Sequence, residues 1–128
     1  MFASPRNGVI AELSFTAECL KSDIQLYKPT IDVGCDFITL LKNKPVKIQV
    51  KSSSSLSPNG KGYVFGITSR GGDKERYSGI DFFAFYALPL GLTYIIPSHV
   101  INKTKITIYP NRITCKFSQY LNAFYLLK

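Results

Sequence analysis

The feature that most constrains the fold is the stretch between residues 37 and 51, which has the pattern of a β-hairpin. The run Phe37–Leu41 is rich in aliphatic and β-branched residues, and the run Lys44–Lys51 alternates between polar and apolar residues. Lys42 and Asn43 lie between the two runs and can form a two-residue turn. The sequence therefore predicts two antiparallel strands joined by a tight turn.

The register of this hairpin groups three polar side chains on one face. With a two-residue turn, Asp36 lies opposite Gln49. Lys51 follows two residues further along the same face, because side chains alternate along a strand. Ile48 and Val50 then point the other way, into the core. A slip of one residue would separate the three polar groups.

A helix before the hairpin is predicted to add a second carboxylate. Apolar residues recur at helical spacing between residues 6 and 20, and they predict a buried stripe through Val9, Leu13 and Leu20. Glu12 falls at the border of that stripe. From there it could reach the edge of a sheet against which the helix packs.

The remaining segments predict an α/β fold in one domain, residues 1–128, with a mixed central sheet flanked by helices. Further strands are expected at residues 24–27, 63–68, 81–88, 92–96 and 106–109, with a short helical turn at 97–98 and a terminal helix at 118–127. Asp81, at the start of a very apolar strand, is interpreted as a strand-end hydrogen-bonding residue. The three widely spaced cysteines predict free thiols, without a disulfide or zinc framework.

The four polar residues Glu12, Asp36, Gln49 and Lys51 predict a phosphodiester-hydrolysing site. Two carboxylates and an amide oxygen are hard ligands of the kind that Mg²⁺ takes, together with several waters. An ammonium group could steady an attacking water or the charge that develops on phosphorus. A metal, an activated water and a nearby cation are the parts that this hydrolysis needs.

These residues also resemble a known family. The patterns Gly8-x-x-x-Glu12, Asp32-x-Gly-x-Asp36 and Ile48-Gln-Val-Lys51 are similar to those of the PD-(D/E)XK nuclease superfamily. They are most similar to the branch with a Gln-x-Lys motif, which includes a cyanobacterial group I intron homing endonuclease. The segments at residues 80–84 and 94–98 resemble that branch as well, so the similarity covers most of the chain.

The resemblance implies a restriction-endonuclease-like core and a role for each site residue. Asp36 and Glu12 would bind the divalent metal, and Lys51 would assist the nucleophile. Gln49 stands where other members of the superfamily place an acid. Glutamine keeps a carbonyl oxygen but carries no charge, so we expect weaker metal binding, or one ion in place of two.

The charge balance favours double-stranded DNA as the partner. Sixteen Lys and Arg side chains against eight Asp and Glu give a formal net charge of +8, which favours a polyanion. We expect two loops to contact DNA. Their candidate residues are Ser52, Ser53, Ser54 and Lys61 in the first, and Arg70, Lys74 and Arg76 in the second.

The leading functional prediction is a Mg²⁺-dependent, site-specific endonuclease of the homing type, in the cytoplasm and without a membrane span. A restriction enzyme and a Holliday-junction resolvase are the nearest alternatives. A non-catalytic DNA-binding protein of the same fold and a basic domain with no nucleic-acid role also stay open. A chain of this size covers only a module-scale DNA patch, so we expect a homodimer or homotetramer.

Several of these polar residues also have a purely structural interpretation. Glu12 could be an ordinary solvent-facing residue of its helix. Asp32 could cap or turn the chain before the strand. Lys51 could protect a strand edge from aggregation.

Overall fold

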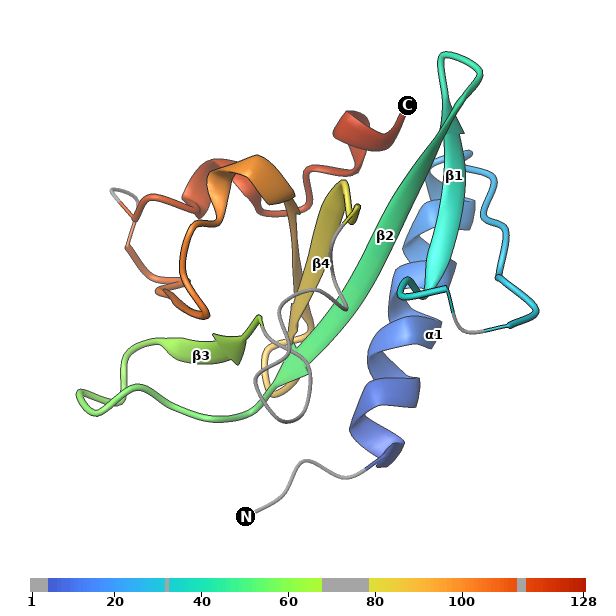
Figure 1. Ribbon diagram of the computed structural model, residues 1–128. Helices are drawn as coiled ribbons and strands as arrows, with labels where there is room; N and C mark the ends of the chain where they lie inside the picture. The colour runs from blue at the N-terminus through green and yellow to red at the C-terminus, as the bar shows by residue number, and fades with distance from the viewer. Residues whose placement is uncertain (1–4, 32, 68–78, 113–114) are drawn as a thin grey trace.

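A computed structural model describes residues 5–31, 33–67, 79–112 and 115–128 (Figure 1). The chain begins with helix α1 (Pro5–Lys21). A four-stranded sheet has the order β1-β2-β4-β5, and a two-stranded sheet pairs β3 with β6. The strands are β1 (Phe37–Leu41), β2 (Lys44–Ser53), β3 (Tyr63–Gly66), β4 (Phe82–Ala87), β5 (Leu92–Pro97) and β6 (Lys105–Ile108).

The predicted hairpin is confirmed in position and register. Strands β1 and β2 are antiparallel, with Leu41 opposite Lys44 and Phe37 opposite Ile48. Lys42 and Asn43 both have positive φ, 52° and 67°. Two successive left-handed residues are the signature of the turn whose twist suits a hairpin, and asparagine adopts that conformation at low cost.

Strand β2 is interior and makes the central sheet mixed, as predicted. It pairs with β1 on one side and runs parallel to β4 on the other, while β4 and β5 are antiparallel. Asp81 joins these strands just before β4: its Oδ2 accepts a hydrogen bond from the Lys47 N–H at 2.9 Å, and its own N–H donates to the Lys47 carbonyl at 2.9 Å. The interpretation of Asp81 as a strand-end hydrogen-bonding residue is confirmed.

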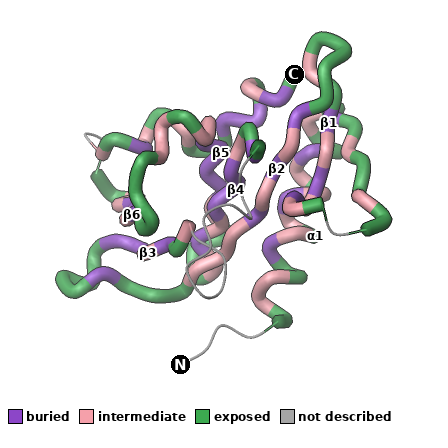
Figure 2. The backbone as a smooth tube through the Cα atoms, viewed as in Figure 1, coloured by how far each residue is buried: buried purple, intermediate pink, exposed green. Residues whose placement is uncertain are grey.

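Two hydrophobic clusters cover the two faces of this sheet. On one face α1 packs against alternate residues of the hairpin, including Phe37, Ile48 and Val50. On the other face Phe83 and Phe85 of β4 pack under the β3–β6 pair. Figure 2 shows the buried residues concentrated along the central strands, with exposed residues at the hairpin tip. Each face of β2 therefore has its own set of neighbours.

The buried face of α1 differs from the prediction. Val9, Leu13 and Leu20 are 53%, 64% and 72% exposed. The buried residues are Ala11, Phe15 and Cys19, on the opposite side of the helix. The Phe15 ring lies 5.5 Å from that of Phe37 and 6.0 Å from that of Phe124. The helix carries apolar residues on two sides, and the side with the aromatic ring buries more apolar area per residue.

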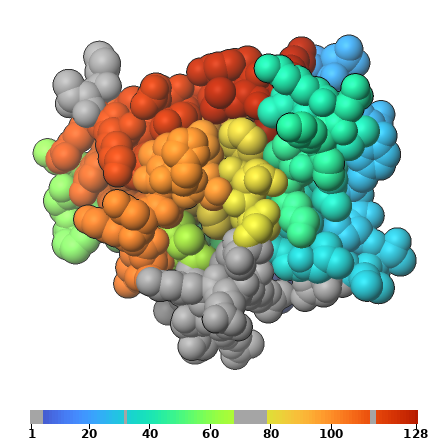
Figure 3. Space-filling model, turned by 45° about the horizontal axis from the view of Figure 1, so that its top comes forward, coloured from blue at the N-terminus to red at the C-terminus, as the bar shows by residue number. Residues whose placement is uncertain are grey.

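The predicted terminal helix is wrong. Two short 3₁₀-helices, η3 (Ser118–Tyr120) and η4 (Phe124–Leu127), stand in its place. Asn122 between them has a φ of 53°, and its N–H donates to the Thr93 carbonyl, so the chain docks on β5 instead of continuing as a helix. The C-terminal segment then lies beside the hairpin (Figure 3). Leu127 and Lys128 line a hollow together with Thr39 and Leu40 of β1.

Two smaller expectations are also resolved. The helical turn after β5 is confirmed as η2 (Ser98–Val100). The strand expected at residues 24–27 is reduced to one bridge between Tyr27 and Ile38.

In the described parts of the chain, α1 is the only α-helix, so the sheet has a helix on one face and a β-ribbon on the other. No helix in those parts has the length and apolarity that a membrane span requires.

Candidate functional site

Asp36 lies at the open end of the hairpin, one residue before β1. Its N–H donates to the Ile48 carbonyl at 3.0 Å, and its Oδ2 accepts a hydrogen bond from the Val50 N–H at 2.8 Å. The backbone N–H groups of a strand point sideways, in the plane of the sheet. A carboxylate that accepts a hydrogen bond from one of them therefore lies near that plane, between the two faces of the sheet. The carboxylate is therefore within reach of groups from both faces.

The electrostatics of Asp36 show which groups surround it. Burial raises the pKa of this carboxyl above its ordinary value, because the charged form loses water. The Val50 hydrogen bond opposes that shift. The charge of Glu12 raises the pKa further, whereas Lys51 and Lys28 lower it. The charges of Glu12, Lys51 and Lys28 therefore all act on the Asp36 carboxyl.

Gln49 and Lys51 share the face of β2 that lies away from α1. They are half-buried, and in the parallel ladder Gln49 is beside Phe83 and Lys51 beside Phe85. Ile48 and Val50, which alternate with them, are buried against the helix side, as predicted. The face parity expected from the hairpin therefore holds for both residues.

Glu12 forms an ion pair with a residue that sequence reasoning missed. The Lys28 Nζ lies 3.5 Å from the Glu12 Oε1, and their side chains are 70% and 29% exposed. The same ammonium lies 5.7 Å from the centroid of the Phe37 ring. Lys28 follows Tyr27 in a segment without periodicity, so only the three-dimensional fold reveals it. A cation is thus already placed beside the Glu12 carboxylate.

A pocket of about 350 Å³ opens beside this ion pair. It lies between α1 and the segment that leads to the hairpin, and it is mostly apolar apart from the ion pair. Its lining residues are Val9, Glu12, Leu13, Thr16, Leu26, Lys28 and Phe37. Glu12 is thus accessible from outside the protein although its helix is packed on the sheet.

The residues predicted to contact DNA are placed only in part. Ser52 and Ser53 belong to the end of β2, and Ser54 and Lys61 are exposed in the loop that follows. The Ser53 hydroxyl is engaged within the fold: it donates to the Val64 carbonyl at 2.6 Å and accepts from the Ser55 N–H at 3.0 Å. Outside the described residues lie Asp32, Arg70, Lys74 and Arg76.

Comparison with known proteins finds similarity among solved structures. No family model matches the chain, and no curated protein sequence matches it. The mixed sheet with a helix across one face is the fold of a bacterial homing endonuclease. That protein is I-Ssp6803I, whose structure matches with a TM-score of 0.80 and 25% sequence identity, over 99% of this chain and 92% of that chain. The expected nuclease-like α/β fold is therefore confirmed.

Proposed function

We propose that this protein is a metal-dependent endonuclease of double-stranded DNA and that Glu12, Asp36, Gln49 and Lys51 form its active site. The observation that carries the proposal is the position of Asp36 at the open end of the hairpin, where its carboxylate is bonded to the Val50 N–H and the charges of Glu12 and Lys51 act on it. The chain that carries it has the fold of a homing endonuclease. The assignment to the PD-(D/E)XK superfamily, with residues 1–128 as one nuclease domain, is part of the same proposal.

The donor set at this site suits Mg²⁺. Glu12 and Asp36 offer carboxylate oxygens and Gln49 offers an amide oxygen, and Mg²⁺ commonly takes few protein ligands and keeps several waters. The Lys28 ammonium beside Glu12 supports metal binding here, because it shows that the fold accommodates a positive charge next to this carboxylate. No group of three His, Cys, Asp or Glu side chains forms a metal cluster in the described parts of the chain, so water would complete the coordination. A bound Mg²⁺ would polarise the scissile phosphate and acidify a water molecule.

The chain's own residues would do the remaining work. The Val50 hydrogen bond orients the Asp36 carboxylate before any ligand arrives, so little ordering is left to be done on binding. The Lys51 ammonium holds the attacking water or the negative charge that grows on the phosphate oxygens as the P–O bond breaks. Gln49 contributes an oxygen without charge, which favours one metal ion of modest affinity.

Site-specific cleavage of the homing type is the finer part of this proposal. Ser52, Ser53, Ser54 and Lys61 stay our candidates for contacts at the end of β2, and Arg70, Lys74 and Arg76 for those in the following segment. A restriction or junction-resolving nuclease would use the same chemistry on another substrate. Sequencing the 5′ ends that the protein produces from a plasmid library distinguishes the three types of nuclease. A homing enzyme cuts at a single long site, a restriction enzyme at a short frequent site, and a resolving nuclease at a DNA structure.

We further propose that the active protein is a homodimer or homotetramer. The described residues of one chain supply one such site, and a cut through both strands of a duplex needs two. Light scattering of the free protein measures the number of copies, and a monomer that cuts both strands would contradict this part of the proposal.

The central experiment is plasmid nicking with and without Mg²⁺. We expect nicking by the wild-type protein only with the metal, and loss of nicking in Asp36→Asn with DNA binding retained. Asp23→Asn is the matched control, because Asp23 is exposed and has a φ of 61°, a conformation that asparagine accepts. DNA binding by the wild type without any nicking would instead identify a non-catalytic binding protein.

A further inference from the structure

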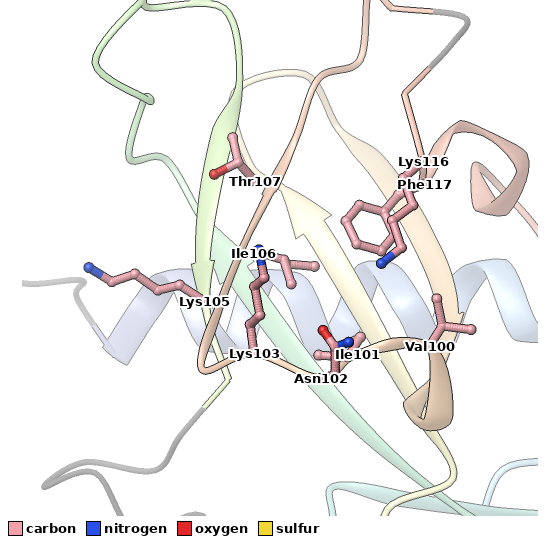
Figure 4. A pocket seen from close by; sticks show the side chains of 9 residues that line it. All are labelled: Val100, Ile101, Asn102, Lys103, Lys105, Ile106, Thr107, Lys116 and Phe117. Atoms are coloured by element: carbon pink, nitrogen blue, oxygen red, sulfur yellow. The ribbon is translucent and has the colours of Figure 1, made fainter.

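A second pocket, of about 290 Å³, lies on the other side of the central sheet from α1 (Figure 4). It is formed by the segment that follows η2, by β6 and by the chain just before η3. Its lining residues are Val100, Ile101, Asn102, Lys103, Lys105, Ile106, Thr107, Lys116 and Phe117. The proposed nuclease chemistry uses none of them.

This pocket is strongly basic. Lys103, Lys105 and Lys116 are in its lining, and the lining contains no Asp or Glu. Among the described residues, no carboxylate lies within ion-pair distance of any of the three lysines. From residue 82 to the end the sequence has five Lys and Arg side chains and no acidic residue, so the charge around the pocket is uncompensated. Such a surface attracts an anion.

The polar groups of the pocket are arranged around an apolar floor. The Lys103 and Lys116 side chains approach from different sides, with the Asn102 amide between them, while Lys105 extends outward (Figure 4). The Lys116 ammonium lies 5.4 Å from the centroid of the Phe117 ring, a cation–π contact that limits its freedom. Phe117 and Ile106 are each 7% exposed. An apolar floor strengthens the attraction between the lysines and an anion above it.

The pocket shares a sheet face with part of the proposed active site. Its floor residues Ile106 and Phe117 belong to the same hydrophobic cluster as Phe83 and Phe85. Gln49 and Lys51 are beside those two phenylalanines in the parallel ladder, so their side chains leave the sheet on that face. The pocket and these two side chains are therefore on the same side of the central sheet as the β3–β6 pair.

We propose that this pocket binds a phosphodiester group of the DNA backbone and anchors the duplex at a second point away from the cleavage site. The proposal rests on the proposed nuclease function for the identity of the polymer. Two ammonium groups and an amide N–H supply the donors that phosphate oxygens accept. Because a backbone phosphate carries no sequence information, this binding adds affinity equally for all sequences.

The test is the salt dependence of DNA binding, measured by fluorescence anisotropy with a labelled duplex and no metal. Lys103→Gln with Lys116→Gln removes the two converging charges. Lys42→Gln with Lys44→Gln, at the exposed hairpin tip, is the matched control with the same reduction in charge. The slope of log affinity against log salt should become shallower by about 0.9 for each DNA phosphate that the variant no longer neutralises. We expect that change in the pocket variant only, and equal slopes in both variants would overturn the proposal.

Two further measurements separate the possible outcomes. Titration of the wild type with inorganic phosphate, followed by amide NMR shifts at Ile106 and Thr107, tests the pocket without DNA. Phosphate binding there combined with equal slopes would identify a small-anion site and overturn the proposal. Plasmid nicking by the wild-type protein tests the nuclease proposal separately. If the wild type nicks and the two variants have equal salt slopes, only the pocket proposal fails. If the wild type does not nick but the pocket variant alone has a shallower salt slope, only the nuclease proposal fails.

Discussion

The Oδ2 atom of Asp36 accepts a hydrogen bond from the backbone N–H of Val50 across the open end of the β1–β2 hairpin, at 2.8 Å. The Asp36 N–H donates to the Ile48 carbonyl in the next position of the same ladder. Backbone and side chain of Asp36 thus both continue the pairing of the two strands. The carboxylate is held in place by the same interactions that form the sheet.

Replacement of Asp36 by asparagine should stabilise the protein without metal at neutral pH. The folded-state pKa of Asp36 is raised, mainly by burial, above the unfolded value of about 3.9. The folded state therefore holds its proton more tightly, and this contribution to stability is complete below the unfolded pKa and is lost as pH rises through the folded pKa. Asparagine still offers an oxygen to the Val50 N–H but cannot ionise.

Thermal unfolding in EDTA checks this expectation. The Tm of Asp36→Asn should exceed that of the wild type at about pH 7, and the difference should shrink toward about pH 3. Added Mg²⁺ should stabilise the wild type and not the variant, because a ligand of the folded state raises Tm. An Asp36→Asn protein that is less stable than the wild type at pH 7 would contradict the burial argument.

Replacement of Lys28 by glutamine should increase the apparent affinity for Mg²⁺. The ammonium competes with a metal for Glu12, at 3.5 Å. Since the lysine of the pair is 70% exposed, we expect the Mg²⁺ concentration for half-maximal nicking to fall by only about two- to fivefold. Lys28→Arg, which keeps the charge, serves as the control. Equal Mg²⁺ requirements in all three proteins would show that the ion pair does not compete with the metal.

Phe15 and Leu13 provide a direct test of which face of α1 is buried. Phe15 is 1% exposed, whereas Leu13 is 64% exposed. We expect Phe15→Ala to lower the free energy of unfolding by about 3–5 kcal/mol. Leu13→Ala should change it by less than about 0.5 kcal/mol in the monomer. Urea unfolding of both variants measures these values, and a larger cost at Leu13 would restore the face expected from the sequence.

The three cysteines should differ in reactivity. Burial, helped by the charge of Glu18, raises the pKa of the Cys19 thiol to about 12, and Cys35 is buried as well. Cys115 is only partly buried. Because the thiolate is the reactive form, a thiol reagent at pH 8 should modify one cysteine quickly in the folded protein. Cys115→Ser should remove that fast phase, and its persistence would mean that Cys19 or Cys35 is accessible.

Local pattern was sufficient to predict the hairpin and therefore the strand positions of much of the proposed site. The spacing around Lys42 and Asn43 determines which side chains share a face, and Gln49 and Lys51 lie where that register places them. Lys28 was not predicted, because its contact with Glu12 depends on how the connection between α1 and β1 passes over the helix. Spacing within a chain carries no information about such a crossing.

Two of the errors in the predicted fold have a shared physical cause. The helix α1 is apolar on two sides, so the choice of face depends on what the sheet offers, here the rings of Phe37 and Phe124. The terminal segment has helical spacing, yet Asn122 bonds to β5 and stops it. In both places tertiary contacts override a local preference that is weak or ambiguous.

The interior position of β2 determines how the proposed site can be lost. This strand carries Gln49 and Lys51 and is hydrogen-bonded to a neighbour on each side. To open it, both ladders and both hydrophobic clusters would have to break, so its amides should be among the slowest to exchange with deuterium. The arrangement around Asp36 should accordingly persist for as long as the native state does, and heat should inactivate the molecule only by unfolding it entirely.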